Sequence, residues 1–147
     1  MDAAPTSVLL IDDNAELLDL LSRSLTYLGR FNVLRAENGE RGLELAVSAH
    51  PACVVVDVMM PGLDGYRLVR ALRGDPETAD IPVVMLTALA QDHNRAAGFL
   101  SGSDCYLLKP VKPQDLVTAI RQAIASSHEE RASRLRSLVN GDELDTL

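Results

Sequence analysis

The sequence contains few cysteines, and their setting argues against a cysteine-based metal or redox site. Only two occur, Cys53 and Cys105, and both lie inside apolar runs without CxxC or His/Cys ligand spacing. Isolated thiols of this kind are typical of proteins kept in a reducing compartment. We therefore predict two buried, unpaired thiols.

Basic residues are scarce relative to acidic ones. The chain has 14 Lys and Arg residues against 21 Asp and Glu residues, which gives a formal net charge of −7. A nucleic acid backbone or an anionic membrane surface rewards clustered Lys and Arg instead. We therefore expect no direct nucleic acid binding by this chain and no membrane partner.

Long apolar runs are absent as well. No apolar segment of signal-peptide type follows the N-terminal "MDAAPTS", and no run approaches the roughly 20 residues that span a membrane. These absences favour a cytoplasmic protein.

The sequence does contain enough apolar residues for one ordinary domain, at 47% of 147 residues. Short apolar runs alternate with segments whose apolar residues recur at helical spacing. The runs predict five strands, at Ser7–Ile11, Phe31–Ala36, Cys53–Asp57, Val83–Leu86 and Asp104–Leu108.

A predicted helix follows each strand. The first ends at Gly29, the second follows Asn38, the third follows Asp64, a weak fourth spans Gln91–Leu100, and the fifth follows Pro113. Strands joined by crossover helices form a parallel sheet covered on both faces. Because no GxGxxG follows the first strand, we predict an α/β fold of the (βα)5 flavodoxin-like, doubly wound type, with strand order 2-1-3-4-5.

Polar side chains lie at the carboxyl ends of four of these strands. Asp12 and Asp13 follow the first, Asp57 ends the third, Thr87 follows the fourth and Lys109 follows the fifth. The carboxyl ends of parallel strands meet at one edge of the sheet, where ligands bind in open α/β folds. We therefore expect these five residues to converge.

Three carboxylates at one site repel each other unless positive charge is present. A hard divalent ion such as Mg²⁺ prefers carboxylate ligands, and Lys109 adds a fixed positive charge. Asp57 would then be an ionised, oriented nucleophile, as in proteins that form acyl-phosphates. Phosphoryl transfer needs mainly alignment and charge neutralisation, so this chemistry suits the predicted site.

Four motifs together resemble the receiver domain of bacterial two-component response regulators. They are "VLLIDDN", "VVVDVMMPGLDGYRLVRALR", "VVMLTALA" and "SDCYLLKPVKP", and the resemblance covers roughly Ser7 to Ala125. It implies that Asp57 is the phosphoacceptor and that Asp12 and Asp13 hold Mg²⁺ with it, with Mn²⁺ as a possible substitute. It also implies a third protein ligand, the backbone carbonyl of Met59.

The same resemblance assigns the remaining site residues. Thr87 would be the switch hydroxyl that moves to bind the phosphoryl group, and Ala88 the small residue that leaves room for it. Lys109 would pair with a phosphoryl oxygen, and Tyr106 would be the aromatic that turns inward when Thr87 moves. The Lys109–Pro110 bond is usually cis in this family.

Simpler structural roles are open for several of these residues. Asp13 or Asn14 can cap the first helix, and Asp64 can cap the third. Thr87 can be an ordinary strand-end hydroxyl, and Tyr106 can be a half-buried packing residue.

The sequence thus favours a phosphorylation-dependent signalling switch and not a conventional turnover enzyme. Its partners would be a sensor histidine kinase or histidine phosphotransfer protein, then a downstream protein or output domain, with a homodimer as a further possibility. The signal would reach the face formed by helix 4, strand 5 and helix 5, and dephosphorylation would be intrinsic.

Two other function classes are weaker. A non-phosphorylated pseudo-receiver would be expected to have lost Asp57, Lys109 or one of the acidic pair, and the sequence keeps all of them. A metal-dependent aspartyl phosphohydrolase usually carries a second acid two residues after its nucleophile, where this chain has Met59, and a cap insertion that is missing here.

The C-terminal segment carries the least information. We assign residues 1–125 to the receiver domain and 126–147 to a helical extension, linker or disordered tail. Its short apolar stripe favours continuation of the last helix, and a frayed, solvated tail is the alternative.

Overall fold

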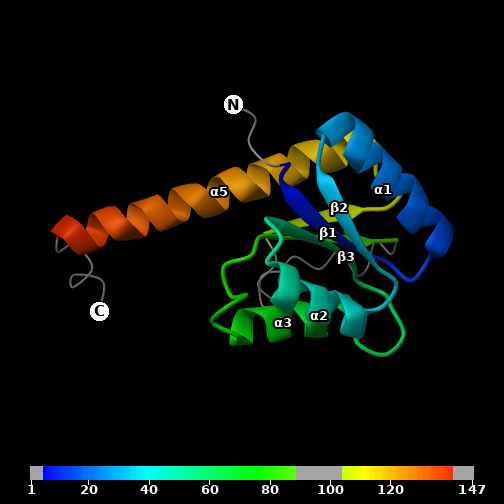
Figure 1. Cartoon of the computed structure of the whole chain (residues 1–147), viewed down its shortest axis with the longest axis horizontal. Coiled ribbons are helices and arrows are strands. Elements are labelled where there is room, and N and C mark those ends of the chain that lie inside the picture. The colour runs from blue at the N-terminus through cyan, green and yellow to red at the C-terminus, as the bar shows by residue number, and fades with distance from the viewer. Residues whose placement is uncertain (1–4, 89–103, 141–147) are drawn as a thin grey trace.

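The computed structural model describes residues 5–88 and 104–140, and strands and helices alternate along the chain as far as Thr87 (Figure 1). The strands are β1 (Ser7–Ile11), β2 (Asn32–Ala36), β3 (Cys53–Asp57), β4 (Val83–Thr87) and β5 (Cys105–Leu108). The helices are α1 (Ala15–Gly29), α2 (Gly39–Ala49), α3 (Gly65–Gly74) and α5 (Pro113–Asn140). The predicted helix at Gln91–Leu100 lies outside the described residues.

The strands form one five-stranded parallel sheet in the order β2-β1-β3-β4-β5, which confirms the predicted fold class and strand order. β1 and β3 are neighbours because the chain reverses its direction of winding after β2. Their register pairs Ile11 with Val56, so the residues that follow β1 lie beside the end of β3. This switch point is where open α/β sheets bind ligands.

The sheet is covered on both faces, which explains why its central strands are continuously apolar. Alternate residues of a strand point to opposite faces, so Val8 and Leu10 pack with α1 and α5, while Leu9 and Ile11 pack with α2 and α3. Figure 1 shows α1 and α5 on one side of the sheet and α2 and α3 on the other. The helices thereby hold the strand ends in fixed positions.

Side-chain caps begin three of the helices. Asn14 accepts a hydrogen bond from the Leu17 N–H at 3.1 Å, and Asn38 accepts one from the Arg41 N–H at 2.7 Å. Asp64 accepts from the Arg67 N–H at 2.9 Å, which confirms the cap predicted for α3. At the start of α1 the cap is Asn14, so Asp13 is left for another role.

The structure differs from the sequence prediction at the start of β2, by one residue each at the end of β4 and the start of β5, and at one cysteine. Phe31 was predicted in the strand, but its N–H closes the end of α1 by donating to the Leu25 carbonyl at 3.3 Å. Cys53 is buried as predicted, whereas Cys105 is only half-buried because β5 is the edge strand. The prediction of a buried thiol was therefore wrong for Cys105.

α5 is one helix from Pro113 to Asn140, and Figure 1 shows it reaching well past the sheet. Ser127 ties it to the base of the domain by donating to the Asp80 carbonyl at 3.3 Å. The division of the chain at residue 125 stays a prediction. Within residues 5–88 and 104–140, every helix is too short or too polar to cross a membrane.

Candidate functional site

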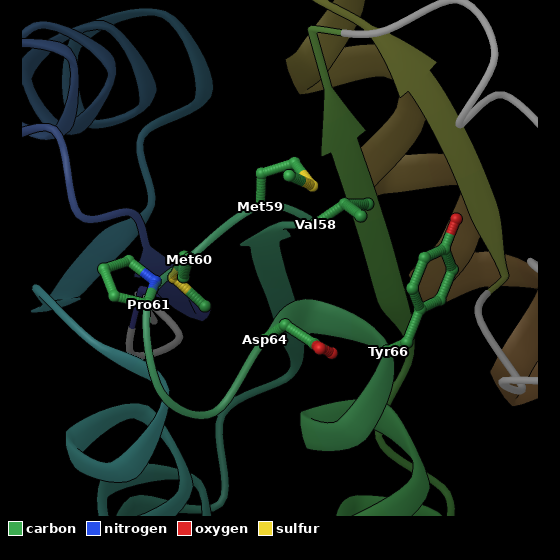
Figure 2. Close-up of a pocket in the computed structure, with 6 residues that line it drawn as sticks. All are labelled: Val58, Met59, Met60, Pro61, Asp64 and Tyr66. Atoms are coloured by element: carbon green, nitrogen blue, oxygen red, sulfur yellow. The ribbon is translucent and has the colours of Figure 1, made fainter.

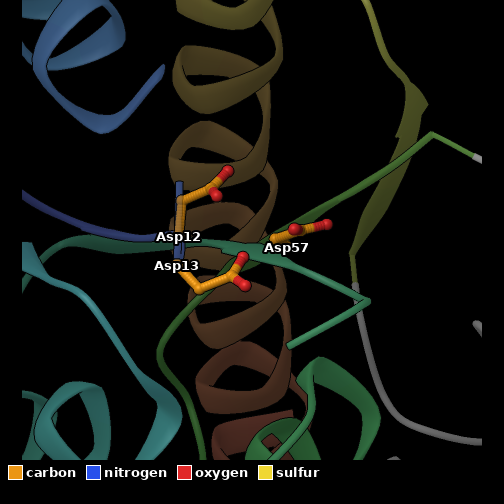
Figure 3. Close-up of side chains that lie close together, drawn as sticks. All are labelled: Asp12, Asp13 and Asp57. Atoms are coloured by element: carbon orange, nitrogen blue, oxygen red, sulfur yellow. The ribbon is translucent and has the colours of Figure 1, made fainter. Parts of the chain in front are cut away.

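Three carboxylates meet at the carboxyl ends of β1 and β3 (Figure 3). Asp12 and Asp13 follow β1, and Asp57 is the last residue of β3. One oxygen from each lies within 4.8 Å of the others. The parallel register of β1 and β3 produces this cluster, as the sequence predicted.

The carboxylates differ in their exposure. Asp12 is 1% exposed and Asp57 6% exposed, whereas Asp13 is open to solvent. Backbone N–H groups orient the buried pair: Asn14 donates to Asp12 Oδ1 at 2.9 Å, and Met59 donates to Asp57 Oδ1 at 3.4 Å. The site therefore has two fixed carboxylates inside and one at its mouth.

Lys109 places a positive charge against both buried carboxylates. Its Nζ lies 3.0 Å from Asp12 Oδ2 and 3.3 Å from Asp57 Oδ2. The lysine follows β5, 97 residues away from Asp12 in the sequence. Its backbone N–H donates to the Thr87 carbonyl at 2.6 Å, which fixes the start of the β5–α5 loop beside β4. The Lys109–Pro110 peptide bond is cis.

Burial raises the pKa of Asp57 above its ordinary value, and the charge of Asp12 adds to the rise. The Lys109 ammonium and the Met59 N–H act in the opposite direction but do not cancel it. Three carboxylates against one ammonium leave two negative charges in excess, which is the charge that a divalent cation neutralises. The all-oxygen donor set suits a hard cation, so the cluster could hold a metal such as Mg²⁺.

Thr87 and Ala88 lie at the end of β4, next to β3. Thr87 is fully buried and pairs in register with Leu108 on β5, directly before Lys109. Ala88 is exposed and borders a cavity of about 350 Å³ together with Lys109 and residues of α1. The fold therefore places both at the same sheet edge as the carboxylates.

Tyr106 lies on β5, one strand farther out and three residues before Lys109. It is half-buried and packs against the α2 and α3 side of the sheet. Its hydroxyl lies 2.8 Å from the hydroxyl of Tyr66. No sequence signal indicated this pairing, because the two tyrosines are 40 residues apart and lie in different predicted elements.

Met59 lies in the loop between β3 and α3, with 56% of its surface exposed. It borders a cavity of about 440 Å³ that Figure 2 shows with its other lining residues, Val58, Met60, Pro61, Asp64 and Tyr66. This loop connects the end of β3 to the first turn of α3. Two methionines, Met59 and Met60, line this cavity together with the Asp64 carboxylate.

Residues 8–121 match the response regulator receiver domain family. The chain is 41% identical over 114 residues to the DNA-binding dual master transcriptional regulator RpaA of Synechocystis, covering 78% of this chain and 47% of RpaA. The chain spans about half the length of the curated relatives it matches.

Solved structures of receiver domains share the fold. The receiver domain of the Francisella response regulator 1452 has a TM-score of 0.75 at 30% identity, covering 83% of this chain and 98% of that one. The receiver domain of the sensor histidine kinase PA1611 from Pseudomonas aeruginosa has a TM-score of 0.75 at 27% identity, covering 83% and 99%. That PA1611 structure carries a magnesium ion coordinated in its active site cleft.

Proposed function

This chain belongs to the response regulator receiver domain family, and on that premise we propose that it is a signalling switch phosphorylated on Asp57. Membership of this family implies a histidine kinase or another phosphodonor as partner. The observation that carries the assignment to Asp57 is the ion pairing of Lys109 with both Asp57 and Asp12 inside the carboxylate cluster. A buried carboxylate at a strand end, with a lysine against it, is poised for phosphoryl transfer.

The proposed reaction is an in-line displacement at phosphorus. An oxygen of Asp57 forms a bond to the phosphorus of a phosphohistidine, the phosphorus–nitrogen bond breaks, and the imidazole leaves with the electron pair of that bond. Lys109 lies 3.3 Å from Asp57, so its ammonium can pair with an oxygen of the transferred group. Hydrolysis of the acyl-phosphate later restores Asp57, which is the intrinsic dephosphorylation expected of a switch.

We propose that Asp12, Asp13, Asp57 and the Met59 carbonyl hold Mg²⁺, with Mn²⁺ as a substitute. When bound, the ion would neutralise charge on the phosphoryl oxygens. The excess of negative charge at the cluster and the raised pKa of Asp57 both support a cation at this place. The magnesium ion in the cleft of the related PA1611 receiver domain supports the same choice.

We further propose that Thr87, Ala88 and Tyr106 convert the new charge into a change of surface. Thr87 would shift toward the phosphoryl group, Ala88 would leave room for it, and Tyr106 would change its ring position on β5. Ligand-driven changes of this kind are population shifts between two states. The responding face would include β5, α5 and the predicted helix at Gln91–Leu100. That helix lies outside the described residues.

The output partner is proposed as a downstream protein, an output domain or a second copy of the chain. RpaA is named as a DNA-binding regulator, but this chain spans only about half the length of such relatives. The net charge of −7 argues against nucleic acid binding by the chain itself. We therefore assign recognition of DNA to a partner or to another domain, and we propose that the switch works in the cytoplasm.

The direct test is incubation of the chain with Mg²⁺ and acetyl phosphate, a small acyl-phosphate donor, followed by intact-mass spectrometry. We expect one added phosphoryl group per chain that hydroxylamine removes, as for an acyl-phosphate. Asp57→Asn should abolish it, and omission of Mg²⁺ should reduce it strongly. Asp64→Asn is a matched control from the adjacent loop, because asparagine caps a helix as well as aspartate.

Other outcomes would favour the alternative functions. Phosphorylation that persists in Asp57→Asn would move the phosphoacceptor to another residue. No phosphorylation of the wild-type chain, with partner binding intact, would indicate a pseudo-receiver. Repeated hydrolysis of a phosphomonoester substrate would indicate an aspartyl phosphohydrolase.

A further inference from the structure

The hydrogen bond between Tyr66 and Tyr106 joins the first turn of α3 to the edge strand β5. The two hydroxyl oxygens lie 2.8 Å apart in a partly buried setting, and either hydroxyl can donate. Figure 2 shows the Tyr66 ring rising from α3 with its hydroxyl directed away from Met60 and Pro61. A hydroxyl removed from water needs such a partner, so the bond helps to decide where each ring rests.

The same first turn of α3 is also fastened to the segment that directly follows the phosphoacceptor strand. The Gly65 N–H donates to the Val58 carbonyl at 3.1 Å, directly after Asp57. A Cβ at position 65 would lie 2.7 Å from the Asp57 carbonyl oxygen, so the helix approaches β3 more closely than any other residue would allow. A displacement of the loop after Asp57 must therefore move the turn that carries Tyr66.

Tyr106 lies on a strand that has freedom to respond. β5 is the sheet edge, and within the described part of the chain its ladder partner is β4, with Tyr106 opposite Met85. The Tyr106 ring is half-buried and packs in the same apolar cluster as Tyr66. An edge strand bearing a half-buried ring is easier to rearrange than the central strands, which are fully buried.

We propose that the Tyr66 hydroxyl is a positioning group for the Tyr106 ring and couples the Asp57 loop to β5 through α3. The inference rests on the proposed switch role of Tyr106 and adds a residue to it. The bond holds the Tyr106 ring on the α3 side of the sheet. Phosphorylation of Asp57 alters the loop at the base of α3, and the shared hydrogen bond makes the two rings change together.

The test uses Tyr66→Phe, which removes one oxygen and leaves the ring to pack. The chain has only three tyrosines, so labelling with 3-fluorotyrosine gives a fluorine spectrum with few signals. Tyr27 is 85% exposed and serves as the internal reference, and Tyr27→Phe is the matched control. Spectra are recorded with Mg²⁺, before and after addition of acetyl phosphate.

We expect the Tyr106 signal of Tyr66→Phe to shift before the donor is added. Loss of one ordinary hydrogen bond should change the ratio of the two ring positions by roughly two- to ten-fold. The change induced by the donor should then be smaller than in the wild-type chain, because part of the shift has already occurred. The Tyr27 signal should not move, and Tyr27→Phe should leave the Tyr106 signal as it is.

Failure of this inference differs from failure of the proposed function. If intact mass shows no phosphoryl group on the wild-type chain, the proposed function fails, while the spectra without donor still report whether Tyr66 positions Tyr106. If the wild-type chain is phosphorylated and the Tyr106 signal of Tyr66→Phe matches wild type with and without donor, the inference is overturned. Tyr66→Phe could also be less stable than wild type and still keep the full donor-induced change of the Tyr106 signal. The hydrogen bond would then have only a structural role, and the proposed coupling would be overturned.

Discussion

Asp57 is the only charged residue of β3, and the other four residues of that strand are apolar and fully buried. Burial raises its pKa, so the folded chain disfavours the ionised form that the proposed chemistry needs. Lys109, at 3.3 Å, and the Met59 N–H offset part of this effect. We therefore expect Asp57 to lower the free energy of unfolding, a cost that buried functional charges often carry.

Replacing the Asp57 carboxylate should stabilise the metal-free chain. With a chelator present at neutral pH, Asp57→Asn should raise the free energy of unfolding by about 0.5–2 kcal/mol, the range common for stabilising substitutions. Lys109 keeps Asp12 as its partner at 3.0 Å, so the ammonium is not left unpaired. Urea unfolding followed by circular dichroism measures the difference.

The pH dependence of this difference has a definite sign. Because the pKa of Asp57 is higher in the folded than in the unfolded chain, the protonated form favours folding. The wild-type chain therefore loses stability as pH rises from the ordinary carboxyl range through the raised folded value, while asparagine does not titrate. The advantage of Asp57→Asn should grow across that window and stay constant above it. An Asp57→Asn variant less stable than wild type at neutral pH would contradict the argument.

At the scale of elements, the packing of α3 against the end of β3 determines the shape of the loop around the site. The approach is close enough that a Cβ at Gly65 would lie 2.7 Å from the Asp57 carbonyl oxygen and 2.9 Å from the Val58 Cα. Both are backbone atoms and cannot turn aside as a side chain would. The glycine therefore sets the distance between helix and strand.

Gly65→Ala should disturb both stability and phosphorylation. Forcing a methyl group into this contact should cost about 1–3 kcal/mol of unfolding free energy, as overpacking does in cores. It should also slow phosphorylation by acetyl phosphate, because the displaced backbone belongs to Asp57, the proposed phosphoacceptor. Gly74→Ala is the matched control at the other end of α3, where nothing lies within 4 Å of an added Cβ. Equal behaviour of the two variants would show that the close approach has no consequence.

Most elements could be predicted from sequence because apolar runs and helical spacing carry their signal locally. The strands β1, β3 and β4 could be located from their apolar runs. The alternation of strands and helices then predicted a parallel sheet, and with it the convergence of four charged residues, Asp12, Asp13, Asp57 and Lys109. The start of β2 could not be predicted, since the Phe31 N–H closes α1 at the Leu25 carbonyl, a contact that apolarity does not report. The pairing of Tyr66 with Tyr106 depends on tertiary geometry between distant segments.

At the scale of the whole molecule, the candidate metal site exists only when the chain is folded. Its carboxylates come from the ends of β1 and β3, and the lysine follows β5. A ligand that binds the folded chain and not the unfolded chain stabilises the fold by mass action. Metal binding should therefore be visible as stability, independently of any phosphoryl transfer.

Mg²⁺ should raise the unfolding free energy of the wild-type chain, by about 2.7 kcal/mol when its concentration is a hundred times its dissociation constant. Thermal unfolding at matched ionic strength measures the effect, and a chelator should reverse it. Asp12→Asn, Asp13→Asn and Asp57→Asn should each weaken the response, whereas Asp64→Asn, outside the cluster, should keep it. The order of stability of wild type and Asp57→Asn should accordingly invert between chelator and saturating Mg²⁺. An equal gain in all four variants would mean that Mg²⁺ acts on the general negative charge of −7 and not at this cluster.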